Sequence, residues 1–237
     1  MLAAMQLARA LFTQGFGSRR ECAALCLAGR VRVRGAVFDD PAAEIDADAV
    51  EVDGRHWPLR TKALVLLHKP PEVECSRKPR DHPSVLSLLP MPLRRRGVQP
   101  VGRLDADTTG LLLLTDDGAL IHRWTHPKRH LPKVYEVRTK HPLDALQLQA
   151  LRDGVTLLDD PLPVRAAAAE ATGTHALRLT LTEGRYHQVK RMLAAVGNRV
   201  EGLHRSAFGA LRLPADMAPG AWCWVEPVDV DASIIGA

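Results

Sequence analysis

The sequence predicts a mixed α/β protein of the α+β class, in which a small N-terminal α/β module precedes a larger domain of strands and flanking helices. The chain has 237 residues, a length typical of one or two domains. Hydrophobic residues make up 46% of it, which is enough for a sizeable core. The first 60 residues have the patterns of two short helices and short strands. From residue 63 onward the patterns predict longer strands interspersed with helices.

The N-terminal module is predicted to open with two short helices. Residues 2–12 are apolar at helical spacing, and Gly15 ends this helix. Ser18 then caps a second helix, with Glu21 three residues later completing a capping box, and Gly29 ends it. Both helices therefore have start or stop signals in the sequence itself.

A strand with an uneven charge distribution follows these helices. Val31 and Val33 alternate with arginines, so the valines face the core and the arginines face solvent. Residues 1–34 hold six arginines and one acidic residue, whereas residues 39–53 hold seven acidic residues and no basic one. This separation predicts a positive face that suits a phosphate backbone and from which the acidic segment turns away. A solvated charged surface explains the charges alone equally well.

The remainder of the chain is predicted to form a mixed α/β domain. His56 to Lys62 is interpreted as a linker, and Arg94–Arg96 as a Pro-flanked loop that is either a mobile charged tip or an RNA contact. Residues 166–169 are predicted at a strand edge, and Trp222 and Trp224 in core or edge-strand packing. Strands are predicted at 63–67, 111–114, 133–139 and 176–182, and helices at 83–89, 143–151 and 186–196.

Bulk properties favour a soluble protein that binds polyanions. The net charge is +5, and the four cysteines are scattered without a C-x-x-C pair. No N-terminal segment has the composition of a signal peptide, and no apolar run approaches the ~20 residues of a membrane span. A reduced cytoplasmic location is therefore expected.

One polar loop stands out because chemistry-bearing residues precede a buried strand. Gly102 to Gly110 contains an arginine, two aspartates and two threonines, and four leucines follow it. Its spacing of Asp105, Asp107 and Asp116 imitates a calcium loop, but leucines occupy positions that should be polar. A calcium site is therefore disfavoured, and Asp107 is expected to organise the loop by accepting local backbone bonds.

Other cofactor motifs are disfavoured as well. His122, His126 and His130 recur every four residues as helical metal ligands can, but Pro127 interrupts the helix. The pair Gly15–Gly17 lacks both the preceding strand and the third glycine of a dinucleotide site. No phosphate-binding loop or nucleophile elbow is found in the sequence.

A second motif, E-G-R-Y-H-Q-V-K-R-M, opens the helix predicted at 186–196. Val189, Met192 and Leu193 share one face of this helix and are expected to be buried. His187 and Lys190 belong to a neighbouring polar stripe. That stripe is either a solvated face or part of a site.

The motifs together resemble a known enzyme family. G-R-L-D-x-D-T-T-G-L-L-L-L-T-D-D-G, the K-x-Y at Lys133 to Tyr135, and E-G-R-Y-H-Q-V-K-R-M-x-A-A-V-G-N are similar to the three motifs of RNA pseudouridine synthases. Their wording is most similar to the subfamily that modifies 16S ribosomal RNA. G-x-G-S-R-R-E-C-A-A-L and A-G-R-V-R-V-R-G, ending in V-x-V-D-G, resemble the S4 RNA-binding module. Gln6 to Arg9 departs from that module's usual Arg-Leu-Asp-Lys opening.

The resemblance implies an S4-like domain at residues 1–58 and a catalytic domain at 59–237 with a mainly antiparallel central sheet. It implies that Asp105 is the catalytic carboxylate, Tyr135 stacks on the target uracil and Lys190 pairs with Asp105. Arg103 is expected to replace the flipped base in its stack. Further substrate contacts are expected from Thr108, Arg185, His187, Gln188 and Arg191. Phosphate contacts are expected from Arg19, Arg20, Arg30 and Arg34.

The implied reaction explains these residue types. Isomerising uridine means breaking the N1–C1′ bond and rejoining the base through C5, so the base must first leave its stack. An inserted arginine and an aromatic platform can offset the unstacking, and a cation keeps a desolvated carboxylate ionised. Nothing is consumed, so no cofactor is expected. Whether Asp105 acts as a nucleophile or as a base stays open.

The expected partner is ribosomal RNA, and the expected oligomeric state is a monomer. Two alternatives remain: a synthase for large-subunit RNA, and a non-catalytic RNA-binding assembly factor. His68 to Glu72 departs from the family's N-K-P-x-G, with Glu72 in place of glycine. That substitution questions the local turn but not the chemistry at Asp105.

Overall fold

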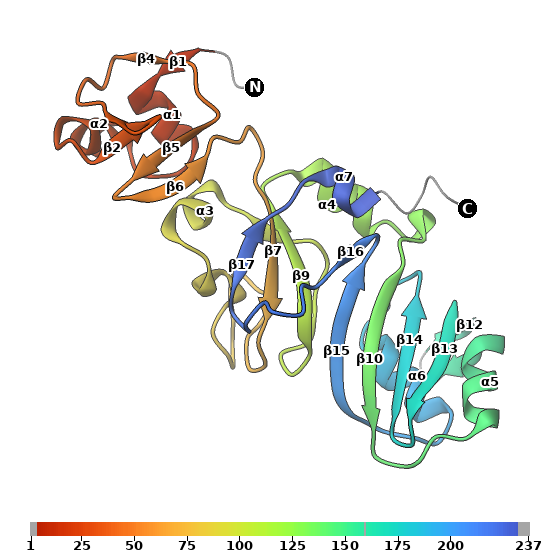
Figure 1. The fold of residues 1–237 in the computed structure, drawn as a ribbon. Coiled ribbons are helices and arrows are strands. Elements are labelled where there is room, and N and C mark those ends of the chain that lie inside the picture. The colour runs from red at the N-terminus through yellow and green to blue at the C-terminus, as the bar shows by residue number, and fades with distance from the viewer. Residues whose placement is uncertain (1–3, 159, 232–237) are drawn as a thin grey trace. The chain divides into compact units, whose positions relative to one another are not determined.

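The computed structural model describes residues 4–158 and 160–231 (Figure 1). The chain forms two compact units. Unit 1 comprises the residues up to Ala63 together with Leu89–Gln99 and Thr115–Asp117. Unit 2 comprises Leu64–Leu88, Pro100–Leu114 and the residues from Gly118 onward. The domain boundary between residues 58 and 59 stays a prediction. The compact units do not share one boundary in the sequence, because unit 1 includes two short segments from later in the chain.

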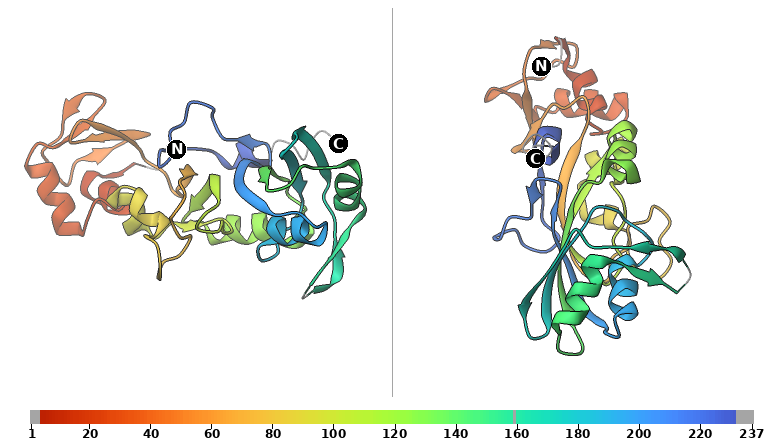
Figure 2. Two further views of the ribbon diagram at one scale, coloured as in Figure 1. Left: turned by 90° about the horizontal axis from the view of Figure 1, so that it is seen from below. Right: turned by 90° about the vertical axis from the view of Figure 1, so that its right-hand side faces the viewer.

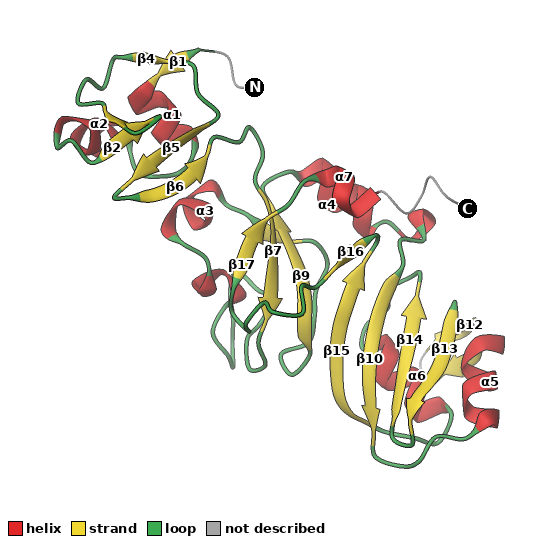
Figure 3. Cartoon of the chain, viewed as in Figure 1, coloured by secondary structure: helices red, strands yellow, loops and turns green. Residues whose placement is uncertain are grey.

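Unit 1 contains three helices and a four-stranded sheet of order β3-β2-β5-β6 among its described residues (Figure 3). A two-stranded sheet pairs β1 with β4. The elements are β1 (Met5–Gln6), α1 (Leu7–Thr13), α2 (Arg19–Leu27), β2 (Val31–Val33), β3 (Ala36–Val37), β4 (Glu44–Ile45), β5 (Ala49–Val52), β6 (Arg55–Pro58) and α3 (Met91–Arg96).

The second helix follows its sequence signals, whereas the first begins later than predicted. Ser18 and Glu21 form the reciprocal bonds of the capping box. Helix α1 begins at Leu7 and not at residue 2, because Met5 pairs with Ile45 in a short strand. Residues 2 and 3 of the predicted helix lie outside the described residues. Pairing with a segment forty residues away is not visible in local helical spacing.

The linker predicted from His56 to Lys62 is wrong over its first part. Arg55–Pro58 forms β6, which pairs with β5 and places Trp57 opposite Val50. Asp53 and Gly54 have φ of +52° and +73°, the conformation of a tight hairpin turn. The Asp-Gly pair was the available signal for this hairpin.

Two of the four predicted phosphate ligands already contact acidic segments of unit 1. Arg30 donates two hydrogen bonds of 2.6 Å to the Asp53 carboxylate. Arg34 donates to the backbone carbonyl of Asp46 at 2.6 Å. The acidic segment therefore does not turn away from the arginines as predicted, because bidentate pairing at the β2–β5 end is favourable.

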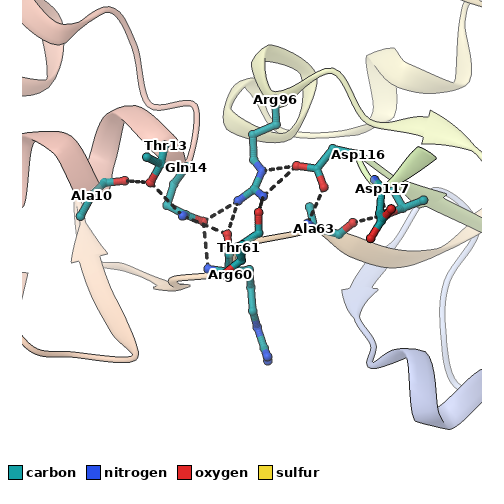
Figure 4. A network of polar contacts seen from close by, with 10 residues as sticks. Ala10, Thr13, Gln14, Arg60, Thr61, Ala63, Arg96, Asp116 and Asp117 are labelled. Atoms are coloured by element: carbon teal, nitrogen blue, oxygen red, sulfur yellow. Dashed lines mark hydrogen bonds and ion pairs between the residues drawn. The ribbon is translucent and has the colours of Figure 1, made fainter. Parts of the chain in front are cut away.

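Arg94–Arg96 is not a mobile loop. These residues form the last turn of α3, and the Arg96 side chain is only 4% exposed. Its guanidinium group contacts the Asp116 carboxylate, the Gln14 side chain and backbone carbonyls of Arg60 and Thr61 (Figure 4). Three adjacent arginines thus have different environments that their sequence does not distinguish.

Unit 2 is built on a nine-stranded, mainly antiparallel sheet of order β13-β14-β10-β15-β9-β7-β17, with β16 and β8 at its margins. β15 and β9 pair in parallel. Helices α5 and α6 lie on the same side of this sheet (Figure 2) and pack into one hydrophobic core with it.

The strands that form this sheet are β7 (Leu64–Lys69), β8 (Gln99–Pro100), β9 (Thr109–Thr115), β10 (Lys133–Thr139), β13 (Ala168–Gly173), β14 (Ala176–Leu181), β15 (Val200–Phe208), β16 (Leu211–Arg212) and β17 (Trp222–Trp224). The other elements are η1 (Val85–Leu88), α4 (Gly118–Thr125), η2 (Pro127–Arg129), α5 (Ala145–Asp153), β11 (Val155–Leu157), β12 (Asp160–Val164), α6 (Gln188–Ala195) and α7 (Pro227–Asp231).

The predicted mixed α/β class with a mainly antiparallel sheet is confirmed. The strand predicted at 133–139 has the observed bounds, and β13 and β17 are edge strands as expected. The central strand β15 was not predicted. Glycine and polar residues interrupt its apolar pattern because it contributes to both core and site.

Gly110 is required by a close backbone approach. Its φ is +107°, and a Cβ there would lie 2.3 Å from the carbonyl oxygen of Arg205 on β15. Glycine supplies this backbone conformation, and its missing side chain lets β9 and β15 pair in parallel.

Glu72 adopts the left-handed conformation, with φ of +59°, so the turn persists without the glycine typical of the family. We expect Glu72→Gly to raise the free energy of unfolding by about 0.5–1 kcal/mol, because relief of left-handed strain exceeds the entropy cost of glycine. The exposed contact of Glu72 with His82, 3.3 Å, adds little. Urea denaturation measures this, and Glu72→Ala is the control. An equal gain in Glu72→Ala would contradict the strain explanation.

No helix within the described part of the chain is both long and apolar enough to cross a membrane.

Candidate active site

The predicted catalytic residues, and all the predicted substrate contacts except Arg191, line one pocket of about 750 Å³ in unit 2. Its walls come from the loop before β9, from β10 and β15, and from the start of α6. Asp105, Tyr135 and Lys190 all line it, although they are far apart in the sequence. The tertiary structure therefore assembles the predicted catalytic residues.

The loop that carries Asp105 is anchored by a buried lysine side chain. Lys69, which is fully buried, donates to the carbonyl oxygens of Ala106 and Thr108, both at 2.9 Å, and of Pro70 at 3.0 Å. Burial lowers the pKa of Lys69, while nearby negative groups including Asp107 and Asp105 act in the opposite direction. The sequence places Lys69 in the segment similar to the family's N-K-P-x-G but does not indicate this positioning role.

Lys190 contacts both carboxylates of the loop. Its Nζ lies 3.1 Å from Oδ2 of Asp105 and 2.8 and 2.9 Å from the two oxygens of Asp107. Burial lowers the pKa of Lys190, but the hydrogen bonds to Asp107 and Asp105 outweigh it, so the pKa is raised overall. Asp107 was expected to accept local backbone bonds, but Lys190 is its main partner. The pairing therefore favours the charged form of Lys190.

His187 also reaches Asp105. Its Nε2 lies 3.3 Å from Oδ1 of Asp105, and its own φ is +48°, a strained conformation at the start of α6. The ring of Tyr186 stacks on His187 with centroids 3.8 Å apart. The Tyr186 side chain is exposed and presents an aromatic face at the rim of the pocket.

Solvent exposure differs among three further predicted site residues, Tyr135, Arg103 and Thr108. Tyr135 is half-buried on β10, where the sheet register places it opposite Arg205. Arg103 is exposed and lines the pocket. Thr108 is buried, and its hydroxyl has no hydrogen-bond partner among the described residues. A direct role of Thr108 in substrate binding stays a prediction.

The side chains of the other predicted substrate contacts bond to protein groups in or near the segment that precedes α6. Arg185 contacts the carboxylates of Asp160 and Glu183. Gln188 is buried and hydrogen-bonds the Arg185 backbone amide and the Glu183 carboxylate. Arg191 donates to the Tyr186 carbonyl oxygen at 3.0 Å. These contacts order the segment, and contacts of the three side chains with substrate stay predictions.

Comparisons with known proteins identify the family of this chain. The sequence model of the family described as RNA pseudouridylate synthase matches residues 63–195. A ribosomal small subunit pseudouridine synthase A of Yersinia pestis is 40% identical over 222 residues, covering 92% of this chain and 93% of the relative. Its namesake in Escherichia coli K12 is 40% identical over 191 residues, covering 80% of each chain.

A solved structure supports the same assignment. A crystal structure of a pseudouridylate synthase matches with a TM-score of 0.68 at 30% identity and covers 96% of this chain and 98% of that one. The family model, the relatives and the shared fold define an enzyme that modifies RNA. The chain belongs to the RNA pseudouridylate synthase family, whose members isomerise uridine in RNA to pseudouridine.

Proposed function

We propose that this enzyme isomerises one uridine of 16S ribosomal RNA, and that residues 1–58 act as an S4-like module holding the RNA. The proposal rests on the pairing of Lys190 with Asp105 at 3.1 Å in the same pocket as Tyr135. Two relatives that are 40% identical carry the name of a small-subunit enzyme, which supports the choice of 16S RNA. A monomer in the cytoplasm that acts on RNA or a subunit precursor fits this role.

The geometry suggests how the residues divide the work. The exposed Arg103 at the rim can enter the space that the flipped base vacates. Tyr135 in the wall offers a ring on which the flipped uracil can stack. Lys190 lies against the Asp105 carboxylate and fixes its position for a role as nucleophile or base. His187 approaches the other carboxylate oxygen and restricts its orientation.

The proposed target is tested by mapping pseudouridines in ribosomal RNA from cells with and without the protein. One uridine of 16S RNA is expected to lose its modification in the absence of the protein and to regain it when the wild-type chain is supplied. Loss of a large-subunit modification instead would contradict the 16S assignment while leaving the chemistry unchanged. Asp105→Asn should not restore the modification.

We expect Arg19 and Arg20 to contribute phosphate contacts, because both are exposed at the start of α2. Replacing both with alanine should weaken RNA binding and reduce the slope of log K against log salt by about 1.4 to 1.8. Fluorescence anisotropy at several salt concentrations measures this slope.

Arg30→Ala is the matched control for that experiment. Asp53 already neutralises Arg30 through two hydrogen bonds of 2.6 Å, so its loss should change the salt slope by less than either exposed arginine does. An unchanged slope in the Arg19→Ala, Arg20→Ala double variant would contradict the proposed phosphate contacts.

A further inference from the structure

Arg205 is a buried cation in the pocket with an unused donor. It lies in the middle of β15, is only 2% exposed and lines the pocket that contains Asp105. Its Nε donates to the Leu111 carbonyl oxygen at 2.8 Å. Its Nη2 has no hydrogen-bond partner among the described residues. A buried charged donor without a partner is costly, which makes a ligand the natural partner.

Lys133 lies beside Arg205 on the same face of the sheet. Tyr135 pairs directly with Arg205, and Lys133 pairs with Phe208 beyond a register shift. Lys133 and Tyr135 are two residues apart on β10 and so share one face, and Lys133 and Arg205 both approach the Phe208 ring. The Nζ of Lys133 and the Cζ of Arg205 lie 5.6 and 5.3 Å from the ring centroid of Phe208. Both cations therefore belong to one wall of the pocket.

These two charges are poorly compensated. Burial, and then the charge of Arg205, lower the pKa of Lys133 to about 8, while Glu183 acts weakly in the opposite direction. The Nζ of Lys133 donates to the Leu131 carbonyl oxygen at 3.1 Å. Within the described residues, neither cation forms an ion pair with a carboxylate. The wall is thus a desolvated positive patch that suits an oxygen bearing negative charge.

We propose that Arg205 is a further catalytic residue, whose Nη2, supported by Lys133, hydrogen-bonds a carbonyl oxygen of the flipped uracil and stabilises its negative charge during isomerisation. The proposal deepens the function proposed above and depends on uridine isomerisation at this pocket. Placement opposite Tyr135 favours the base as the ligand. A phosphate of the RNA backbone offers the same oxygen chemistry and is the alternative source.

The charge arises in the bond exchange itself. When the N1–C1′ bond breaks, its electron pair stays with the ring and spreads over O2 and O4. Either C1′ bonds to the Asp105 carboxylate, or C2′ gives a proton to that carboxylate and a C1′–C2′ double bond forms. A ring electron pair then forms the C5–C1′ bond; in the first route it displaces the carboxylate from C1′, and in the second route the double bond takes the proton back at C2′. C5 loses its proton and N1 gains one. Preorganised donors act most strongly on charge that develops only during reaction.

The test compares wild type, Arg205→Met and Lys133→Met on RNA that contains the mapped uridine. We expect Arg205→Met to lower kcat by about 10²- to 10³-fold with the Kd for RNA within twofold of wild type. Lys133→Met should lower kcat by about tenfold. A Kd that rises in proportion to the lost activity, with a smaller salt slope, would assign Arg205 to a phosphate and overturn the proposal.

Sulfur substitution in the substrate provides a second readout that a structural role would not change. Replacing O2 or O4 of the target uracil with sulfur weakens the hydrogen bond it accepts, so one of the two substrates should slow the wild type. The same substitution should have a smaller effect on Arg205→Met. Equal sulfur effects in both enzymes at both positions would overturn the proposal. If Arg205→Met lacks the wild-type circular dichroism spectrum, Lys133→Met takes its place in both comparisons.

Failure of the 16S assignment would be visible separately. The mapped uridine comes from whichever ribosomal RNA loses its modification without the protein. A modified uridine in large-subunit RNA would thus contradict the proposed target. The comparison of Arg205→Met with wild type would still decide the role of Arg205.

Discussion

Asp105→Asn should abolish turnover while leaving RNA binding within about twofold of wild type. Asparagine has the shape of aspartate and can still accept from Lys190, which lies 3.1 Å from Oδ2. It is neither a nucleophile nor a base at neutral pH, so kcat should fall by at least about 10³-fold. Release of the C5 hydrogen from labelled uridine in ribosomal RNA measures turnover.

Asp107→Asn is the matched control, because Asp107 contacts the same lysine at 2.8 Å but is exposed. It should lose less than about tenfold in kcat, since Lys190 keeps Asp105 as a partner. Undiminished hydrogen release by Asp105→Asn would refute the catalytic assignment. Equal losses of binding and turnover would identify Asp105 as a structural residue.

Arg96→Ala should destabilise unit 1 strongly. The Arg96 guanidinium group and the Asp116 carboxylate lie 2.7 Å apart, and their side chains are only 4% and 14% exposed. Removing one member of a buried pair leaves the other charge without compensation, which costs about 3–5 kcal/mol. The same change removes donors to the buried Gln14 side chain and to the Thr61 carbonyl oxygen (Figure 4).

Arg95→Ala provides the comparison one residue away. Arg95 is exposed and approaches the Glu21 carboxylate at 3.5 Å, so its loss should cost less than about 1 kcal/mol. Urea denaturation followed by circular dichroism measures both variants. The two variants would have to differ by several kcal/mol; similar stabilities would mean that the Arg96 network contributes little net free energy.

Arg96 also explains part of the difference between the sequence-based domain boundary and the compact units. Asp116 accepts from the Ala63 amide at 2.7 Å and from Arg96, so residues 63, 96 and 116 meet in one network. Such contacts join segments far apart in the sequence. Composition and local pattern detect linkers, but they do not detect which distant segments share a buried ion pair.

Local signals predicted several elements with correct bounds. The capping box at Ser18, the alternation of Val31 and Val33 and the strand at 133–139 were all readable, because short-range geometry sets them. Strand β6 and the central strand β15 were missed. Trp57 belongs to a hairpin next to a proline, and β15 carries polar site residues such as Arg205 that disrupt its apolar pattern.

The sequence by itself determined the identity of Asp105, Tyr135 and Lys190 as candidates, because their motifs have fixed residue types and spacings. Only the tertiary structure decided that the three line one pocket, that Lys190 is shared with Asp107, and that Lys69 supports the loop. It also decided which cations are buried, as for Arg205 and Arg96. The reason is physical: burial and charge pairing depend on distant segments meeting in space, whereas motifs record only the order of residues along the chain.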